Sequence, residues 1–475
     1  MPVVAVDRLT NIAKAVLEAS GASAEEAATV ARLCVAANLA GHDSHGVIAI
    51  PTYIDRIGKG HIVPGAPFEI KQESATTMVI DGNWGFGFVV AERAARLTIE
   101  KAKTANVAAT SILRQSHVGR VAAYPLMAAK EGLIAIMTAD SGRSPKAVAP
   151  FGGREPRLGT NPICIAMPSD LDGPFVLDMA TSAVAAGKIK LAQAKGTKIP
   201  QGWVVDKHGK PTTDPNEYDR GGILLPLGGS EGYKGYGLSA MVEVFSGLLP
   251  GLGFGVEPTG RHNDGCFLAM FKVEAFRPLA TFRKEVTEFA AYLKATPPAD
   301  GYTEVLYPGE VEWRTEQARR RSGIEVDAKT WKAFQDLGAK HAIPIEGEAA
   351  GLSRRRRNSD PANTCCQSAS TGRTDTSNWP WPCWPARARR RRANAARECA
   401  GRRARSGHSG CSYCSCGECP ARCAPDYRSA GHAWDRRRPH HPSPRQRLRR
   451  PRGPLRTIPR GLSCCLRSSS TSPSP

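Results

Sequence analysis

Short apolar runs bounded by Gly, Pro, Asp or Asn recur from about residue 76, and they constrain the fold more than any other feature. Runs of this length with turn residues at their ends are typical of buried strands. Helical stretches at 88–105 and 120–131 lie between them, and GYGLSAMVEVFSGLL predicts a later buried helix. This alternation predicts an α/β core with a mixed sheet. The predicted strands are TTMVIDG, AATSILR, LIAIMTA, NPICIAMP, PFVLDMA and CFLAMFKV.

Helical segments flank this core on both sides. Ser23 followed by Glu26 forms a capping box ahead of a second amphipathic helix. A third helix is expected to begin at Ser44, which would cap it, and to end at Gly58. The predicted parts are an N-terminal helical unit (1–75), the core (76–308) and C-terminal helices (309–350) that pack against the first unit through residues 309–345.

Residues 351–475 differ in composition from the rest of the chain. The net charge of +21 lies entirely there, with 27 Arg, no Lys and 6 acidic residues, whereas residues 1–350 balance 38 basic against 38 acidic side chains. The segment has too few apolar residues to offset chain entropy, so we expect disorder. We favour a shifted reading frame of GC-rich DNA as its origin, so that residues 1–350 would fold and act without it. A nucleic-acid-binding arm and a zinc knuckle at CSYCSCGEC are the alternatives.

The first 350 residues indicate a cytoplasmic protein. Their cysteines are Cys34, Cys164 and Cys266, which are too few and too scattered for a disulfide framework. The start MPVVAVDRLTNIAK lacks the basic and apolar regions of a signal peptide. No stretch reaches the roughly 18 apolar residues that span a bilayer. We therefore expect no membrane partner.

The stretch GHDSHG at 41–46 places two histidines beside a predicted helix start. If Ser44 caps that helix, His45 lies in its first turn, where the positive end of the helix dipole favours the neutral ring. A neutral imidazole can polarise a carbonyl, and once protonated it can donate to a developing alkoxide. The alternatives are a capped helix with two solvated histidines, or a metal pair. His42 and His45 lack a third ligand nearby in sequence, so we expect no metal site.

Further polar segments follow predicted strands or open predicted helices. Glycines in several of them let the backbone come close to a ligand, and a helix N-terminus is a natural phosphate site. The sequence has no strand followed by GxGxxG, so a Rossmann site is not supported. The residues in these segments are His117 and Arg120 in SHVGR, Thr160 and Asn161 in LGTNP, Asp178, Thr181 and Ser182 in VLDMATS, and Lys234 in GYKGYG.

Taken in order, these segments resemble the malate/L-lactate dehydrogenase family that is unrelated to the Rossmann lactate dehydrogenases. That family also includes ureidoglycolate dehydrogenase and the diketogulonate, sulfolactate and Δ1-piperideine-2-carboxylate reductases. The match spans about residues 5–345 and is most similar to the bacterial hydroxycarboxylate dehydrogenase branch. The matching motifs are DSHG with Tyr53, SHVG, LGTNP, LDMATS with GK, PQGWVVDKHGKPTTDP, KGYGL and YPGE.

The resemblance implies an NAD- or NADP-dependent interconversion of a 2-oxo acid and a 2-hydroxy acid. It also implies a non-Rossmann, sulfolactate-dehydrogenase-like fold, and a homodimer with its active site near the subunit interface. By position, His45 would donate and accept the proton, Asp178 would orient it, and His117 would line the site or take the acid/base role itself. The substrate and nicotinamide would be surrounded by Ser44, Tyr53, Thr160 and Asn161. The dinucleotide would be held by Asp178, Met179, Ala180, Thr181, Ser182, Lys234, Gly235, Pro308, Gly309 and Glu310.

One position departs from the family pattern. Many members have an arginine four residues after the DSHG histidine, where it grips the substrate carboxylate, and this chain has Ala49. Loss of a guanidinium removes a charge-assisted contact, so another cation must serve or the substrate differs. Arg120 is the preferred replacement, because one helical turn separates it from His117. The basic residues near these segments are Arg120, Arg143, Lys146 and Arg157.

Three alternatives to a 2-oxo acid reductase stay open at this point. Ala49 could mark a decayed site in a protein that binds the cofactor without turnover, or a site adapted to a cyclic imino acid. The Arg-rich segment 351–475 could bind nucleic acid, which predicts strongly salt-dependent binding. The neutral charge of residues 1–350 argues against a nucleic-acid partner.

Overall fold

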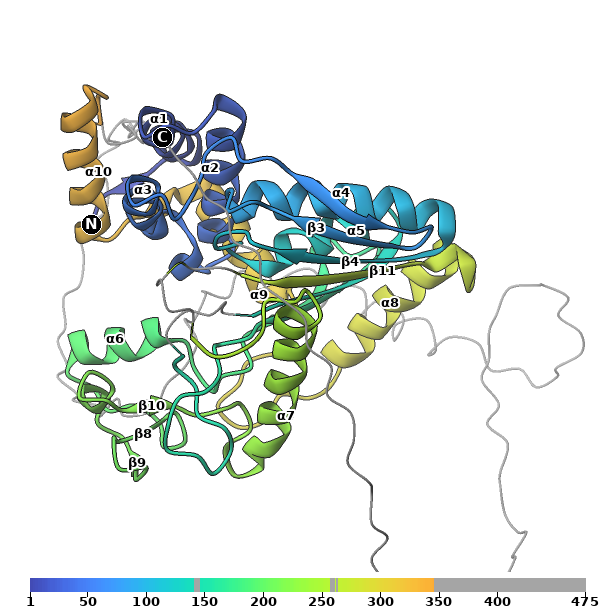
Figure 1. Ribbon diagram of the computed structural model, residues 1–475. Helices are drawn as coiled ribbons and strands as arrows, with labels where there is room; N and C mark the ends of the chain where they lie inside the picture. The colour runs from blue at the N-terminus through green and yellow to red at the C-terminus, as the bar shows by residue number, and fades with distance from the viewer. Residues whose placement is uncertain (141–145, 257–260, 262–263, 346–475) are drawn as a thin grey trace, which may run out of the picture. The chain divides into compact units, whose positions relative to one another are not determined.

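The computed structural model describes residues 1–140, 146–256, 261 and 264–345, so the segment 351–475 lies outside it. A seven-stranded sheet forms its centre, in the order β2-β3-β4-β11-β5-β6-β7 (Figure 1). β3 and β4 are parallel and the other neighbours are antiparallel, which confirms the predicted mixed sheet. The strands are β2 (Glu69–Glu73), β3 (Thr77–Asp81), β4 (Val107–Leu113), β5 (Leu133–Ala139), β6 (Ile163–Met167), β7 (Phe175–Met179) and β11 (Cys266–Lys272).

All six apolar runs predicted as strands are strands, whereas β2 carries no such signal. Its sequence EIKQE is exposed at every residue, because β2 lies at the edge of the sheet. Charged side chains on an edge strand discourage pairing with another chain. They also remove the apolar alternation by which a strand is recognised in a sequence.

Helices α4 and α5 cover one face of this sheet (Figure 1). The buried Ala94 and Ala95 let α4 approach β4 closely, and the hydroxyls of Thr98 and Thr110 lie 2.6 Å apart between the two elements. α5 is shorter than predicted, because a 3₁₀ turn replaces its first residues. The bounds are α4 (Gly87–Ala105), η3 (Val121–Ala123) and α5 (Pro125–Lys130).

Helices α1, α2 and α3 open the chain, as predicted. The capping box is confirmed, since Ser23 Oγ accepts the Glu26 N–H at 3.2 Å and the Glu26 carboxylate accepts the Ser23 N–H at 3.0 Å. Two 3₁₀ turns separate α2 from α3. The bounds are α1 (Val6–Ala19), α2 (Ala24–Leu39), η1 (Asp43–His45), η2 (Val47–Ala49) and α3 (Ile50–Gly58).

The last described helices return to this opening unit. β1 pairs with β12, so the first residues of the chain lie beside Ile324 and Glu325. α9 contacts α2, and α10 contacts α1 and α3. Figure 1 shows α10 beside the N-terminus. The bounds are β1 (Val3–Val4), α9 (Glu310–Ser322), β12 (Ile324–Glu325) and α10 (Ala328–His341).

A small three-stranded sheet and α6 form a second, separate core. Val148, Ile189, Val204 and Leu224 are buried together there, away from the main cluster. The sheet has the order β10-β8-β9. The bounds are α6 (Ala186–Lys195), β8 (Val204–Val205), β9 (Pro211–Thr212), η4 (Pro215–Tyr218) and β10 (Ile223–Leu224).

The helix predicted from GYGLSAMVEVFSGLL forms, but it is buried on one side only. Val242 and Ser239 are buried, whereas Met241 is 53% exposed and Leu249 is 57% exposed. The prediction of a buried helix therefore holds for one face only, because apolar residues on every face of a helix do not indicate which face packs against a neighbour. The bounds are η5 (Gly229–Glu231), α7 (Gly232–Glu243), the π-helical turn η6 (Val244–Leu248), η7 (Val273–Ala275) and α8 (Leu279–Lys294).

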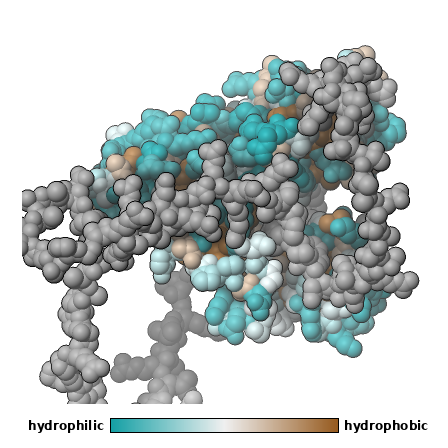
Figure 2. All heavy atoms as spheres, turned by 180° about the vertical axis from the view of Figure 1, so that it is seen from behind, coloured by the Kyte–Doolittle hydropathy of each residue, from teal (hydrophilic) through white to brown (hydrophobic). Residues whose placement is uncertain are grey.

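The surface is mainly hydrophilic on the face that Figure 2 shows, where hydrophobic residues form small, separate patches among the coloured atoms. Scattered apolar side chains of this kind are normal on a folded protein. Among the helices of the described ranges, none is long and apolar enough to cross a bilayer.

Candidate functional site

Two histidines from distant parts of the sequence stack against each other at the centre of the site. The ring centroids of His45 and His117 lie 5.6 Å apart, with 24° between the ring planes. His45 ends η1, and His117 follows β4. The buried Tyr53 of α3 places its hydroxyl 2.6 Å from His117 Nδ1. The structure thus brings together three residues that sequence analysis had selected separately.

Ser44 does not cap a helix, so this part of the prediction is wrong. α3 begins at Ile50 and has no side-chain cap, while Ser44 lies within η1. Its Oγ lies 2.9 Å from Nδ1 of His45 instead. The cause is Asn38, whose amide oxygen accepts the N–H of Val47 at 2.9 Å and holds the chain in two short turns.

The neutral form of His45 is favoured by burial and not by a helix dipole. Burial lowers the pKa of the His45 ring below its ordinary value of 6.5, and the neighbouring His42 lowers it further. Asp178 and Asp264 oppose this shift in the pKa, because a negative charge favours the imidazolium. The net shift is downward, so the neutral ring is the favoured form of His45.

Arg120 and Asp178 form an ion pair beside the histidines. Arg120 donates from Nε to the Asp178 carboxylate at 3.0 Å, and their side chains are only 12% and 8% exposed. Asp178 lies on β7 and pairs with Cys164 of β6 across the sheet. Asp178 thus bonds to Arg120, and it acts on His45 through its electric field.

The other basic residues that could replace the arginine absent at Ala49 lie in different surroundings. Ala49 is half-buried in η2 and packs against the main core. Lys146 pairs with the buried Glu243 at 3.0 Å, and Arg157 pairs with Glu155 at 2.6 Å on the surface. Arg143 lies outside the described residues. The positive charge of Arg120 lowers the pKa of His45, which places it within reach of the histidine.

Thr160 and Asn161 form a polar turn that is tied to the rest of the chain. Asn161 is buried, has a positive φ of 37°, and donates from Nδ2 to Glu243 at 2.8 Å and to the Ser239 carbonyl at 3.1 Å. The Thr160 carbonyl accepts the N–H of Thr181 at 2.9 Å. The turn therefore joins the end of β7 to α7.

The segment after β7 leads toward α6. Met179 ends β7, and Met179 and Ala180 are half-buried. The Thr181 hydroxyl donates to the Thr160 and Asn161 carbonyls at 3.1 and 3.0 Å, and the Ser182 hydroxyl donates to the Val184 carbonyl at 3.0 Å. Both hydroxyls stabilise the loop itself, so a ligand here would meet mainly backbone groups.

Residues 181–183 pair with residues 225–227, as neighbouring strands do in a sheet. This pairing brings the segment after β7 next to the residues that precede α7. Ala183 N–H bonds the Leu225 carbonyl at 2.8 Å, and Leu227 N–H bonds the Thr181 carbonyl at 2.9 Å. Gly235 packs so closely that an added Cβ would lie 2.1 Å from the Leu227 carbonyl oxygen. Lys234 is exposed, with Nζ 3.4 Å from Glu231.

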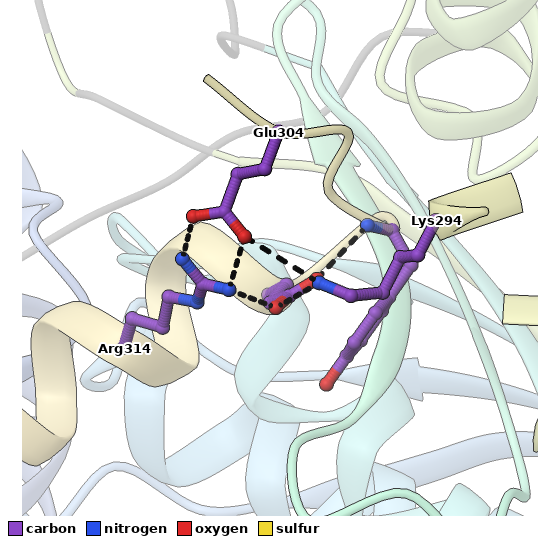
Figure 3. Close-up of polar contacts among 5 residues, drawn as sticks. Lys294, Glu304 and Arg314 are labelled. Carbon is purple, nitrogen blue, oxygen red and sulfur yellow. Dashed lines mark hydrogen bonds and ion pairs between the residues drawn. The ribbon is translucent and has the colours of Figure 1, made fainter. Parts of the chain in front are cut away.

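The Pro308-Gly309-Glu310 turn is held by a dense set of ion pairs, shown in Figure 3. Both carboxylate oxygens of the buried Glu310 accept from Lys294 Nζ at 2.6 Å, and one of them also accepts from Arg314 at 2.6 Å. Glu304 bonds Arg314 in turn. At Gly309, φ is 94° and an added Cβ would meet the Pro174 carbonyl at 2.5 Å. The Glu310 carboxylate thus stabilises the turn through its bonds to Lys294 and Arg314. The backbone of Pro308 and Gly309 lies against the start of β7.

Sequence analysis missed several charged residues around the histidines. Asp264 is 3% exposed, and its Oδ2 accepts the N–H of Val118, next to His117. Glu312 of α9 lies 3.5 Å from His42 Nε2, and this contact lowers the pKa of the Glu312 carboxyl. These contacts join segments 146 and 270 residues apart, so no local motif could have indicated them. In the portion of the chain that the structure describes, no group of three His, Cys, Asp or Glu side chains is placed to hold a metal ion.

Comparison with known proteins identifies the family. A family profile for malate/L-lactate dehydrogenase matches residues 4–335. The chain is 35% identical to malate dehydrogenase of Pyrococcus horikoshii over 349 residues, which cover 72% of this chain and 95% of that protein. It is also 35% identical to hydroxycarboxylate dehydrogenase B of Escherichia coli O157:H7 over 342 residues, which cover 71% and 94%.

A solved structure confirms the predicted fold. Sulfolactate dehydrogenase from Methanocaldococcus jannaschii superposes with a TM-score of 0.67 at 35% sequence identity, over 72% of this chain and 98% of that one. The profile, the relatives and this structure all indicate the same family. The chain therefore belongs to the malate/L-lactate dehydrogenase family.

Proposed function

We propose that this protein interconverts a 2-oxo acid and a 2-hydroxy acid, with NADH or NADPH as the hydride carrier. The observation that carries the proposal is the stacked pair His45 and His117 beside the buried Arg120–Asp178 ion pair. One region then holds a proton donor and a cation for the substrate carboxylate. Dehydrogenases of hydroxy acids among the relatives support the reaction class.

His45 supplies the proton in this proposal. During reduction, a bound reduced nicotinamide would supply the hydride to the carbonyl carbon of the substrate, and the His45 imidazolium would supply the proton to the carbonyl oxygen. In the reverse direction the neutral ring accepts the hydroxyl proton. Its lowered pKa makes the neutral ring the resting form near pH 7.

His117 orients the substrate in this scheme, and Tyr53 fixes its ring. The Tyr53 hydroxyl contacts Nδ1 of His117, so Nε2 lies on the opposite side of the ring from Tyr53. If Tyr53 donates, Nε2 carries the hydrogen and can donate to the substrate carbonyl or hydroxyl. Ser44 and Thr160, which are both at least partly exposed, would lie around the same substrate.

Arg120 binds the substrate carboxylate in place of the arginine that Ala49 replaces. Arg120 donates to Asp178 from Nε. A guanidinium has further N–H donors in a rigid fork, and these can bind a carboxylate. The ion pair with Asp178 fixes the plane of that fork. Asp178 is thereby assigned to hold Arg120 as well as to support the charge on His45.

The N-termini of α6 and α7 fit the phosphates of a dinucleotide. Neither helix has a side-chain cap, so backbone N–H groups there can bind an anion. Glu231 precedes α7 and its carboxylate lies 3.4 Å from Lys234 Nζ, so the N-terminus of α6 is the less acidic of the two. The paired segments 181–183 and 225–227 lead into these two helices. Lys234, which is exposed near the second N-terminus, would have to exchange its contact with Glu231 for a phosphate.

We also propose that the protein is a cytoplasmic homodimer. The exposed apolar side chains of α7, η6 and the following turn offer a surface for a second copy. Cys34, Cys164 and Cys266 are buried and unpaired, as in reducing compartments. Light scattering should give a dimer mass that M241K reduces, while L191K on α6, which is exposed to a similar degree, leaves it unchanged. A monomer at all protein concentrations would contradict the homodimer.

The test of the reaction is steady-state oxidation of NADH and of NADPH in the presence of 2-oxo acids. The double variant H45A/H117A is the negative control (the blank of the assay), because it lacks both candidate proton donors. The proposal predicts turnover by the natural sequence that this blank lacks. Equal rates in the two proteins would show that the histidines do not perform the reaction.

A further inference from the structure

The turn that carries His45 is attached to two helices, α2 and α9, by one polar assembly. Its members are Asn38 of α2, Asp43 of η1 and Arg319 of α9. We propose that Arg319, acting through Asp43 and Asn38, is a positioning residue that holds His45 against His117. This inference rests on the proposed function, because it takes His45 as the group that transfers the proton.

Asn38 joins both ends of the turn with a single side chain. It is 4% exposed, its Nδ2 donates to Asp43 Oδ1 at 2.7 Å, and its Oδ1 accepts the Val47 N–H at 2.9 Å. Asp43 precedes His45 by two residues and Val47 follows it by two. The position of His45 is therefore set by how firmly Asn38 and Asp43 are held.

Glycines let the chain fit around this amide. An added Cβ at Gly46 would lie 2.2 Å from Asn38 Oδ1, a distance that no side chain can adopt. Gly41 has a positive φ of 84°, and its Cβ position lies 3.2 Å from Thr315 of α9. The turn is thus packed directly against both helices, so that a shift of α9 would be transmitted to it.

Arg319 closes the assembly from the α9 side. Its Nη1 and Nη2 donate to the two oxygens of Asp43 at 2.6 and 3.0 Å, and Nη1 also donates to the Asn38 carbonyl. The side chains of Arg319 and Asp43 are 26% and 51% exposed. An ion pair this exposed adds little to stability, whereas the fork geometry fixes direction. The contact is therefore better suited to orientation than to holding the fold together.

α9 touches the same turn a second time. Glu312 lies seven residues before Arg319, which is two helical turns and hence the same face of α9. Its carboxylate lies 3.5 Å from His42. Arg319 and Glu312 thus contact adjacent residues, Asp43 and His42. One rigid helix face positions the histidine turn at two points.

The test compares arginine variants on neighbouring positions of α9. R319A removes the guanidinium group, and R319K keeps a positive charge but without the two-pronged geometry of the guanidinium. R320A is the matched control. Arg320 pairs with Glu316 on the exposed side of the helix, at 2.6 Å. We expect kcat to fall by about 10- to 100-fold in R319A, because a displacement of about 1 Å in a reacting group can cost that much. R319K should recover part of kcat, and the KM for the nicotinamide should not change. Equal kcat values for R319A and R320A would overturn the proposal.

A second measurement separates positioning from loss of charge. The charged and titratable groups that act on His45 are His42, Arg120, Asp178 and Asp264, and NMR titration of the His45 ring in D43A would report how the ring sits among them. Asp43 is not among these groups, so loss of its charge alone should leave the pKa of His45 unchanged or lower, whereas release of the ring toward solvent should raise it. A raised pKa supports the positioning role, and a lowered or unchanged one contradicts it. This readout needs no turnover, so it decides the inference even if the natural sequence reduces none of the 2-oxo acids and the proposed function fails.

Discussion

Arg120 bonds Asp178 through Nε at 3.0 Å, and both side chains are about nine-tenths buried beside His45 and His117. Few buried positions accept a guanidinium, because its charge must be paired there. Here the pairing carboxylate also raises the pKa of His45. In the proposed reaction, this one ion pair would therefore act on the proton donor and also provide the cation for the substrate.

Removal of the Arg120 guanidinium should weaken substrate binding. A hydrogen bond to a charged group contributes about 1.5–3 kcal/mol, so R120A should raise the KM for 2-oxo acids by about 10- to 100-fold. Steady-state kinetics with saturating nicotinamide measures this. R157A is the control, since Arg157 is an exposed arginine paired with Glu155. An unchanged KM in R120A would remove Arg120 from the substrate site.

Replacement of His45 should reduce the chemical step and spare cofactor binding. Positioned acid catalysis contributes about 10²–10⁴-fold, and H45A should lose about that much in kcat. Nicotinamide fluorescence should show an unchanged dissociation constant. A loss below about tenfold, with a larger loss in H117A, would transfer the acid/base role to His117.

The reaction rate should depend on pH with opposite sign in the two directions. Oxidation of a 2-hydroxy acid needs the neutral His45 ring, so its kcat/KM should rise with pH through the pKa of His45 and then level off. Reduction needs the imidazolium, so its rate should fall above that pKa. Because burial lowers the pKa, the inflection should lie below 6.5.

The D178N variant checks the cause of that inflection. Asp178 raises the pKa of His45, so its loss should move the inflection to lower pH. A profile measured in both directions would reveal the shift independently of any loss of rate. Movement toward higher pH would show that another group titrates.

Gly46 should not tolerate a side chain, because its Cβ would overlap Asn38. We expect G46A to lower kcat by displacing the His45 turn, and to lower the free energy of unfolding by about 1–3 kcal/mol. G58A is the matched control, since nothing lies within 4 Å of its Cβ position at the end of α3. Chemical denaturation and kcat measured on both variants provide the comparison. Equal behaviour of the two variants would contradict the packing argument.

Local patterns predicted most of the secondary structure. The six apolar runs became strands, and the capping box at Ser23 marks the start of α2, because these signals involve neighbours in sequence. β2 gave no signal, since an exposed edge strand needs no apolar face. The assignment of Ser44 as a helix cap failed because the buried amide of Asn38, near the end of α2, holds the same backbone.

The site itself could be predicted only in part. His45, His117 with Arg120, and Asp178 were selected from three separate segments, and the fold places them together. Arg319 and Asp264 lie in no motif, and they reach the histidines through contacts across long stretches of sequence. Side-chain pairing at such separations depends on how α9 and β11 pack, which composition and periodicity do not encode.

The most direct test of the central claim is nicotinamide oxidation by the purified protein against a panel of 2-oxo acids. The panel should include pyruvate, oxaloacetate, 2-oxoglutarate, phenylpyruvate and a cyclic imino acid, each with NADH and with NADPH. We expect turnover with one group of 2-oxo acids and loss of that turnover in H45A. Binding of both nicotinamides by the folded protein without turnover of any oxo acid would contradict it, and turnover of the imino acid alone would assign the site to C=N reduction.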